Sequence, residues 1–234
     1  MVLEKKDFIE INFTGRIKDG EVFDSTEKEN LEAMHRGHSH EHVEAHPFIF
    51  CLGEGMFLKA IDDFLIGKQA DSAYEIELSP ENGFGLRNPA LIQKIPIKIF
   101  KEKNINPIPG VSLNFDGRVG KILSVSGGRV IVDFYHFLAG KTLSYKINVI
   151  RKIDDLNEKV NSLNEFFFRK KFDFEINGDK LIMKVESNLV KLVELFKESF
   201  KELLSLDLEI KEIKEIKETE PGKDMNKDLE KSEV

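Results

Sequence analysis

The sequence predicts an α+β fold built from more than one compact unit, and three observations lead to this prediction. Apolar and polar residues alternate at 8–18, 73–79 and 142–153, as is typical of half-buried strands. Between them, residues 57–67 repeat apolar side chains at helical spacing and end at a glycine, the favoured residue just past a helix. The pattern changes again at 86–137 and after residue 154, which favours separate units.

Length and composition narrow the functional classes. A chain of 234 residues exceeds the usual single-domain size. Its 33% charged residues and net charge of −7 give no dominant basic surface, so we expect no nucleic acid partner. No segment approaches the ~20 apolar residues that cross a bilayer, and the N-terminus lacks an apolar signal run, so a cytoplasmic location is expected. The lone Cys51 excludes an internal disulfide framework.

The N-terminal half predicts a sheet and two short helices. Residues 8–18 form a strand, and a DG turn leads to EVFDST at 21–26. Thr26 and Glu29 have capping-box spacing, which predicts a short helix that stops near Gly37. A strand follows at 47–53, then the helix at 57–67 and the strand at 73–79.

The C-terminal half predicts two further units. Short β stretches joined by Gly and Pro fill 86–137, including IPIKIF at 95–100, and precede the strand at 142–153. A helix, a hairpin turning at NGD, one long helix at 187–205 and a strand then follow. The three consecutive phenylalanines at 166–168 favour either a helix that ends there or a dimer contact. The polar tail at 218–234 is expected to be disordered.

Aromatic residues recur through the first 150 positions without a matching set of nucleophiles. No GxSxG, HExxH or Walker motif is present. An enzyme of this kind would depend on an apolar pocket. The recurring aromatic residues are Phe13, Phe23, Phe48, Phe50, Phe57, Phe84 and Tyr145.

Ordered motifs give the chain a family resemblance. INFTGRIKDGEVFDST, PFIFCLGEG, IELSPENGFG and LSYKINV follow one another in the order of the FKBP-type peptidyl-prolyl cis-trans isomerases, which the chain resembles over 7–85 and 138–152. VDFYHFLAGKTLSYKINV resembles the exit from the insert-in-flap domain of SlyD-type members. The C-terminal module is similar to that of the long archaeal branch.

The resemblance implies a division of the chain into four parts. It implies an FKBP-like twisted antiparallel sheet around a short helix at 1–85 and 138–153. A small β-rich chaperone domain is inserted in the flap at 86–137, and an α+β dimerisation domain occupies 154–217.

The resemblance also implies the site and the activity. The activity is isomerisation of X-Pro bonds in unfolded or proline-containing polypeptides, combined with chaperone binding and with no required cofactor. Ile61, Phe13 and Phe84 depart from the tryptophan and tyrosines usual at these positions. The alternative is therefore a chaperone with weak or no turnover. The implied catalytic residues are Phe13, Asp24, Phe48, Phe57, Leu58, Ile61, Phe84 and Tyr145.

Polypeptide binding is expected at the pocket edge and in the insert, and dimerisation in the C-terminal domain. Some apolar residues of the insert must form its core, and the remainder would form an exposed binding patch. Candidate substrate-binding residues are Phe23, Ile95, Ile97, Ile99, Phe134, Tyr135 and Phe137.

Five of the six histidines lie between positions 35 and 46. His38, His40 and His42 alternate, so they share one face of an extended chain and are candidate ligands for Ni, Zn or Cu. The alternative is a solvated loop. SlyD-type proteins often bind metal through a His-rich tail, whereas this tail has no histidine.

Overall fold

A computed structural model of the chain describes residues 1–34 and 45–213. The chain divides into two compact units, residues 1–159 and 160–234. The predicted α+β class with antiparallel sheets is confirmed. None of the helices in the described ranges combines the length and the apolar character needed to cross a membrane.

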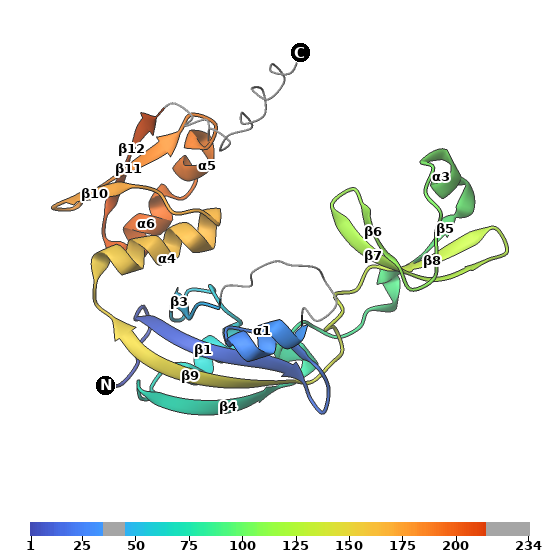
Figure 1. Cartoon of the computed structure of the whole chain (residues 1–234), viewed down its shortest axis with the longest axis horizontal. Helices are drawn as coiled ribbons and strands as arrows, with labels where there is room; N and C mark the ends of the chain where they lie inside the picture. Colours follow the sequence, from blue (N-terminus) through green and yellow to red (C-terminus); the bar gives the residue numbers. More distant parts are fainter. Residues whose placement is uncertain (35–44, 214–234) are drawn as a thin grey trace, which may run out of the picture. The chain divides into compact units, whose positions relative to one another are not determined.

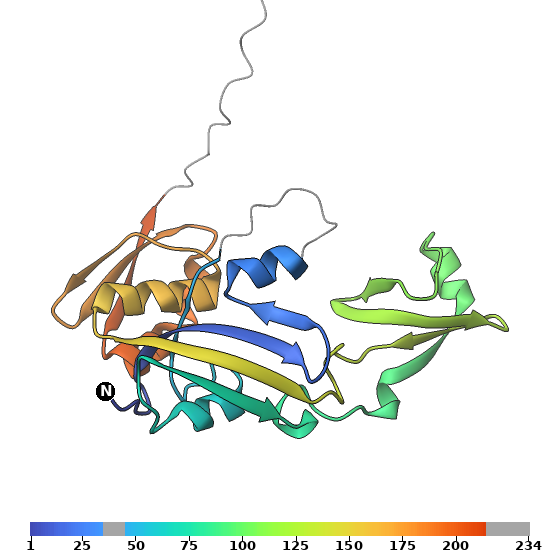
Figure 2. The same ribbon diagram turned by 60° about the horizontal axis from the view of Figure 1, so that its bottom comes forward.

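The first unit is built on a five-stranded antiparallel sheet (Figure 1). The strand order is β2-β1-β9-β4, and β3 pairs with the other end of β1. Figure 2 shows the long, curved strands β1 and β9 running side by side. The strands are β1 (Phe8–Ile17), β2 (Val22–Ser25), β3 (Phe48–Cys51), β4 (Ser72–Leu78) and β9 (Leu143–Ile153).

Alternation along β9 gives the sheet one buried face. Leu143, Tyr145, Ile147 and Val149 are buried, as the period of two in a half-buried strand requires. The short helix α2 (Lys59–Leu65) buries Ile61 and Leu65. These side chains form the core that supports the candidate site.

The helix α1 (Lys28–Met34) begins without the predicted capping box. The Thr26 hydroxyl accepts a hydrogen bond from the Phe13 backbone N–H at 2.8 Å and donates to Asn12 Oδ1 at 3.1 Å. Ser25 Oγ instead accepts from the Glu27 backbone N–H at 3.1 Å. The cap prediction was wrong because the neighbouring strand β1 uses the Thr26 hydroxyl.

A second antiparallel sheet lies between β4 and β9 in the sequence. Its order is β5-β8-β7-β6, and its core contains Phe100, Ile122, Val130 and Val132. The two glycines between β7 and β8, at 127 and 128, both have positive φ, as a tight hairpin turn requires. The elements are η1 (Pro80–Asn82), η2 (Pro89–Leu91), β5 (Ile92–Pro96), α3 (Ile97–Glu102), β6 (Ser112–Phe115), β7 (Arg118–Ser126) and β8 (Arg129–Asp133).

The stretch 95–100 is only partly a strand, which corrects the β interpretation of IPIKIF. β5 ends at Pro96, and α3 begins at Ile97. Helical geometry then places Ile97 and Phe100, three residues apart, toward the same core, while Ile99 is exposed. The strand prediction failed here because isoleucines at alternate positions give the same pattern as a half-buried strand.

The second unit contains a three-stranded sheet. β10 (Phe174–Asn177) pairs antiparallel with β11 (Lys180–Glu186), and β11 pairs parallel with β12 (Asp207–Ile213). A parallel pair needs a crossover connection, which the helices between β11 and β12 provide. The unit begins within α4 (Leu156–Phe168).

The predicted long helix at 187–205 is two helices, α5 (Val190–Glu194) and α6 (Lys197–Leu204). At the break, the N–H groups of Leu195 and Phe196 bond to carbonyls only three residues back, which tightens the turn. Phe196 packs on Phe167 and Phe168, at ring-centroid distances of 4.5 and 5.2 Å. Apolar periodicity continues through the break, so the sequence did not reveal it.

Candidate functional site

Seven rings distant in sequence form one aromatic cluster in the first unit. Each ring lies within 6.4 Å, centroid to centroid, of another member. The aromatic cluster consists of Phe13 on β1, Phe23 on β2, Phe48 and Phe50 on β3, Phe57 before α2, Phe84 after η1 and Tyr145 on β9.

Phe57 is the central ring of the aromatic cluster. Its centroid lies 5.0 Å from Phe13, 5.5 Å from Phe48, 5.6 Å from Phe50 and 5.9 Å from Tyr145. Several of these pairs are edge-to-face or tilted, which aromatic quadrupoles favour over a face-to-face sandwich. The segment before α2 is thereby joined to three strands of the sheet.

Burial divides the aromatic cluster into two layers. Phe13, Phe50 and Tyr145 are buried, as is Ile61 of α2. Phe23, Phe48, Phe57 and Phe84 are partly exposed, and so is Leu58, which precedes α2. An apolar group that approaches the first unit here meets aromatic faces above a close-packed base.

Gly15 on β1 provides the space for two of these rings. A Cβ atom at this position would lie 2.9 Å from Phe23 Cζ and 2.9 Å from Tyr145 Cε1. Gly15 pairs with Asp24 on β2 and with Tyr145 on β9, so two functional candidates flank this glycine on the neighbouring strands.

Burial affects the ionisation of both Asp24 and Tyr145, and the charge of Asp24 also acts on Tyr145. The aromatic surroundings partly desolvate the Asp24 carboxyl and raise its pKa, although a backbone hydrogen bond at Ser25 opposes the shift. Burial, and then the charge of Asp24, raise the pKa of the Tyr145 phenol. Tyr145 is therefore a neutral hydroxyl beside a carboxyl group at physiological pH.

A polar network holds β1, β2 and α1 together beneath the cluster. Thr14 Oγ1 and Ser25 Oγ lie 3.0 Å apart and are both buried. The Asn30 amide donates to Thr14 Oγ1 at 3.0 Å and to Glu27 Oε2 at 2.8 Å. Buried polar groups cost free energy unless they are paired, so this network fixes β2 and its Phe23–Asp24 pair.

His136 extends the cluster and was missed as a site residue by sequence reasoning. Its ring stacks on Phe84 with a centroid distance of 4.4 Å and an interplanar angle of 4°. Phe84 in turn contacts Phe23 edge-to-face at 6.4 Å. The available signal was its place at the start of HFLAG, shortly before β9. Phe50 and Gly15 were also not assigned to the site.

The candidate binding residues of the insert fall into two groups. Ile95, Ile97 and Phe134 pack against the core of the second sheet. Ile99 and Phe137 are exposed, the latter at 63%. Tyr135 is partly exposed beneath the Arg87 guanidinium, 4.9 Å from its ring centroid. Further exposed apolar side chains that the prediction did not name are Ile92, Ile108, Val111, Val119 and Leu123.

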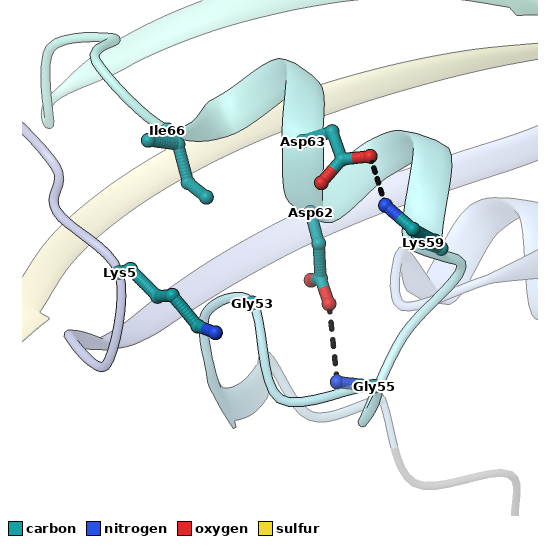
Figure 3. Close-up of a pocket in the computed structure, with 7 residues that line it drawn as sticks. All are labelled: Lys5, Gly53, Gly55, Lys59, Asp62, Asp63 and Ile66. Carbon is teal, nitrogen blue, oxygen red and sulfur yellow. Dashed lines mark hydrogen bonds and ion pairs between the residues drawn. The ribbon is translucent and has the colours of Figure 1, made fainter.

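A separate pocket of about 350 Å³, with both charged side chains and apolar surface in its lining, lies between α2 and the turn at 53–55 (Figure 3). Asp62 is only 2% exposed and accepts a hydrogen bond from the Gly55 N–H at 3.3 Å, while its Oδ1 has no partner among the described residues. Burial raises the pKa of this carboxyl. Asp62 thus holds the turn that precedes Phe57, and this pocket is distinct from the aromatic cluster.

The candidate metal ligands His38, His40 and His42 lie outside the described residues. Within 1–34 and 45–213, no group of three or more His, Cys, Asp or Glu side chains could hold a metal ion. The buried Cys51 is an unsuitable ligand, because burial raises the pKa of its thiol to about 12.

Comparisons with known proteins add independent evidence. A family model described as the FKBP26 IF domain matches residues 93–138. The chain is 30% identical over 148 residues to the short-type peptidyl-prolyl cis-trans isomerase of Methanocaldococcus jannaschii, an overlap of 63% of this chain and 92% of the relative.

Two bacterial relatives are also peptidyl-prolyl cis-trans isomerases by name. The 16 kDa FKBP-type peptidyl-prolyl cis-trans isomerase of Escherichia coli is 26% identical over 144 residues, with 60% of this chain and 87% of the relative covered. SlyD of Haemophilus influenzae is 23% identical over 163 residues, with coverages of 64% and 72%.

The fold, the aromatic cluster and these relatives define the class: the chain is a peptidyl-prolyl cis-trans isomerase. The antiparallel sheet of the first unit carries the site. Most of the site residues come from the motifs quoted above, INFTGRIKDGEVFDST, PFIFCLGEG, IELSPENGFG and LSYKINV, which follow one another along the chain. Within the class, the chain belongs to the FKBP-type family.

Proposed function

We propose that the chain accelerates rotation about X-Pro bonds of unfolded or partly folded polypeptides at the aromatic cluster. The observation that carries this proposal is the layered arrangement, with partly exposed Phe23, Phe48, Phe57 and Phe84 above buried Phe13, Ile61 and Tyr145. The catalytic roles of Phe13, Asp24, Phe48, Phe57, Leu58, Ile61, Phe84 and Tyr145 are part of the proposal.

The reaction suits an apolar site. Rotation about a peptide bond faces a barrier of ~18–20 kcal/mol, because resonance gives the C–N bond partial double-bond character. Cis and trans X-Pro isomers differ by only ~0.5–1 kcal/mol, so catalysis needs only to lower the barrier. Water stabilises the charge-separated planar amide. Aromatic walls remove that water, and they favour the twisted amide if they bind its shape more tightly.

The polar groups of the site hold the peptide without proton transfer. Asp24 is exposed at the edge of the cluster, where its carboxyl can accept hydrogen bonds from peptide N–H groups. The raised pKa of Tyr145 keeps its phenol neutral, and therefore a donor or acceptor but not a base.

The catalytic proposal is tested by two single substitutions. NMR exchange on a proline-containing peptide would give the cis-trans rate with catalytic amounts of protein. We expect Asp24→Ala to lower kcat/KM about tenfold, and Tyr145→Phe about threefold, because each removes one hydrogen-bonding group. An inactive parent, or two variants as active as the parent, would contradict the proposal.

We further propose that the second sheet is an insert-in-flap domain that binds non-native chains. Its exposed apolar side chains support this, since Val119 is 64% exposed and Ile108 is 52% exposed. This activity is also the alternative function, a chaperone with weak or no isomerase turnover. Phe13, Phe84 and Ile61 favour the alternative, because they replace residues usual in the family.

Removal of residues 92–133 separates the two activities. The remaining ends are already adjacent, because the Phe134 N–H donates to the Leu91 carbonyl at 3.1 Å, so a short glycine linker would close the gap. We expect the shortened protein to lose suppression of aggregation and to retain turnover on short peptides. Unchanged suppression of aggregation would contradict the insert proposal.

We also propose that residues 154–217 form a homodimer contact. Leu192 and Leu195 support it, being 42% and 77% exposed on the second unit. Sedimentation equilibrium should show a dimer that Leu195→Asp weakens. A monomeric parent would contradict the proposal.

Metal binding by His38, His40 and His42 remains a separate proposal, supported only by their alternate spacing. Calorimetric titration with Ni²⁺ should show stoichiometric binding that is lost when His38 and His40 are replaced. Equal binding by the variant would contradict it.

A further inference from the structure

His136 occupies a distinctive position at the exposed side of the aromatic cluster. It is exposed, and its imidazole lies parallel to the partly exposed Phe84 ring at 4.4 Å. It also contacts the Phe137 ring at 4.9 Å. Stacking on Phe84 fixes the plane of the imidazole, so its nitrogens point in defined directions.

The local hydrogen bond sets the tautomer of the neutral ring. His136 Nδ1 accepts a hydrogen bond from the Leu138 backbone N–H at 3.3 Å. A neutral imidazole has one acceptor and one donor nitrogen, so Nε2 must carry the hydrogen. Across residues 1–34 and 45–213, no protein acceptor pairs with Nε2–H. An N–H donor is therefore available beside Phe84.

Within the portion of the chain that the structure describes, the partly exposed side of the aromatic cluster has no other side-chain donor of this kind, because the Tyr145 phenol is buried. Its partly exposed members, Phe23, Phe48, Phe57 and Phe84, have no polar side-chain atom, and Asp24 supplies only acceptors when ionised. Apolar sites bind through their walls, but a few placed polar groups fix the orientation of the ligand.

We propose that His136 is a substrate-binding residue whose Nε2–H donates a hydrogen bond to a main-chain carbonyl of the bound prolyl peptide. This inference rests on the proposed isomerase function and adds a residue to that site. The segment that carries His136 follows β8, so it belongs to the exit of the second sheet.

The chemistry of rotation restricts which carbonyl accepts this bond. A donor to the carbonyl of the rotating X-Pro amide would stabilise its charge-separated planar form and oppose catalysis. The acceptor is therefore a neighbouring carbonyl that does not change during rotation. Such a bond stabilises ground and transition states equally, so it affects KM rather than kcat.

Two substitutions at one position test the donor. His136→Phe keeps an aromatic ring on Phe84 and removes the donor, whereas His136→Gln restores an amide N–H. With a proline-containing peptide, we expect H136F to raise KM about fivefold to tenfold with kcat within about twofold. H136Q should recover at least half of this loss, which a purely structural role for His136 would not predict.

A third variant supplies the donor from the neighbouring ring. Phe84→Tyr in the H136F background places a phenolic O–H beside the vacated position, and we expect it to lower KM again. Because H136F also removes the acceptor of the Leu138 N–H, we expect it to lower the midpoint of thermal unfolding slightly, and KM is compared among variants that are folded at the assay temperature. If the parent is active, either of two results would overturn the assignment of His136. One is a KM in H136F equal to that of the parent, and the other is a raised KM in H136F that neither H136Q nor the added F84Y lowers. An inactive parent would instead overturn the proposed function.

Discussion

At the scale of single residues, the site depends on a glycine as well as on its aromatic side chains. Gly15 lies where the rings of Phe23 and Tyr145 both approach β1, and a methyl group there would come within 2.9 Å of each ring. A sequence can show a glycine in a strand, but it cannot show which rings cover it. Such a glycine often marks a close approach, and here the approach is between two elements of the site.

Gly15→Ala should therefore damage the site. Overpacking of this kind typically costs ~1–3 kcal/mol, so we expect the free energy of unfolding, measured in urea, to fall by this amount relative to the parent. Isomerase turnover should also fall, because both displaced rings belong to the site. Gly20→Ala, in the exposed turn after β1, is the matched control: its Cβ would lie 3.2 Å from Ile17 Cβ and away from both rings, so it should cost less stability than Gly15→Ala and leave turnover unchanged. A fully active, fully stable Gly15→Ala protein would show that the two rings do not depend on this glycine.

Asp62 gives a prediction about pH. Its pKa is raised in the folded state, mainly by burial, so the folded chain binds the proton more tightly than the unfolded chain. Stability contributed by this group is thus complete at acid pH and is lost as the pH rises through the raised pKa. Asp62→Asn does not titrate.

The difference in unfolding free energy, parent minus Asp62→Asn, should fall as the pH rises above the ordinary range of an aspartate pKa. Circular dichroism in urea at each pH would measure it. A difference that rises with pH would contradict the assigned burial effect.

At the scale of elements, period-two alternation predicted the strands of the first sheet well, because each buries one face. It failed at 95–100, where three alternating isoleucines belong to a strand and then a helix. Helical periodicity failed similarly at 187–205, since the break near Leu195 leaves the apolar pattern intact. Local patterns report which residues are buried, whereas tertiary packing decides the backbone.

The joint between β1 and α1 offers a test at this scale. Thr26 Oγ1 accepts from the Phe13 N–H at 2.8 Å, next to the aromatic cluster. Thr26→Val keeps the shape and leaves that N–H without its partner, which should lower the free energy of unfolding by ~1–3 kcal/mol. Thr142→Val removes a hydroxyl that makes no hydrogen bond in the described part of the chain, so it should cost less than ~0.5 kcal/mol. Equal effects would show that the Thr26 bond is unimportant.

At the scale of the whole molecule, the ordered motifs predicted six of the aromatic residues that meet in the cluster, but not Phe50 or His136. Phe13, Phe23, Phe48, Phe57, Phe84 and Tyr145 come from four strands and two loops and form one connected set of ring contacts. His136 could not be predicted as a neighbour of Phe84, because 51 intervening residues, which form the second sheet, separate the two in sequence. The exposed residues of that sheet were equally hidden, since apolar composition does not distinguish core from surface.

The central claim is that the aromatic cluster itself catalyses prolyl isomerisation, without metal. The most direct measurement is the proline-limited refolding rate of a substrate protein, with catalytic amounts of this protein and excess chelator. We expect clear acceleration by the parent and a loss of about tenfold in Phe57→Leu, which removes the central ring. Phe64→Leu, on α2 and outside the cluster, should change the rate little. A slow phase that the parent leaves unchanged, or equal activity in Phe57→Leu and the parent, would contradict the claim.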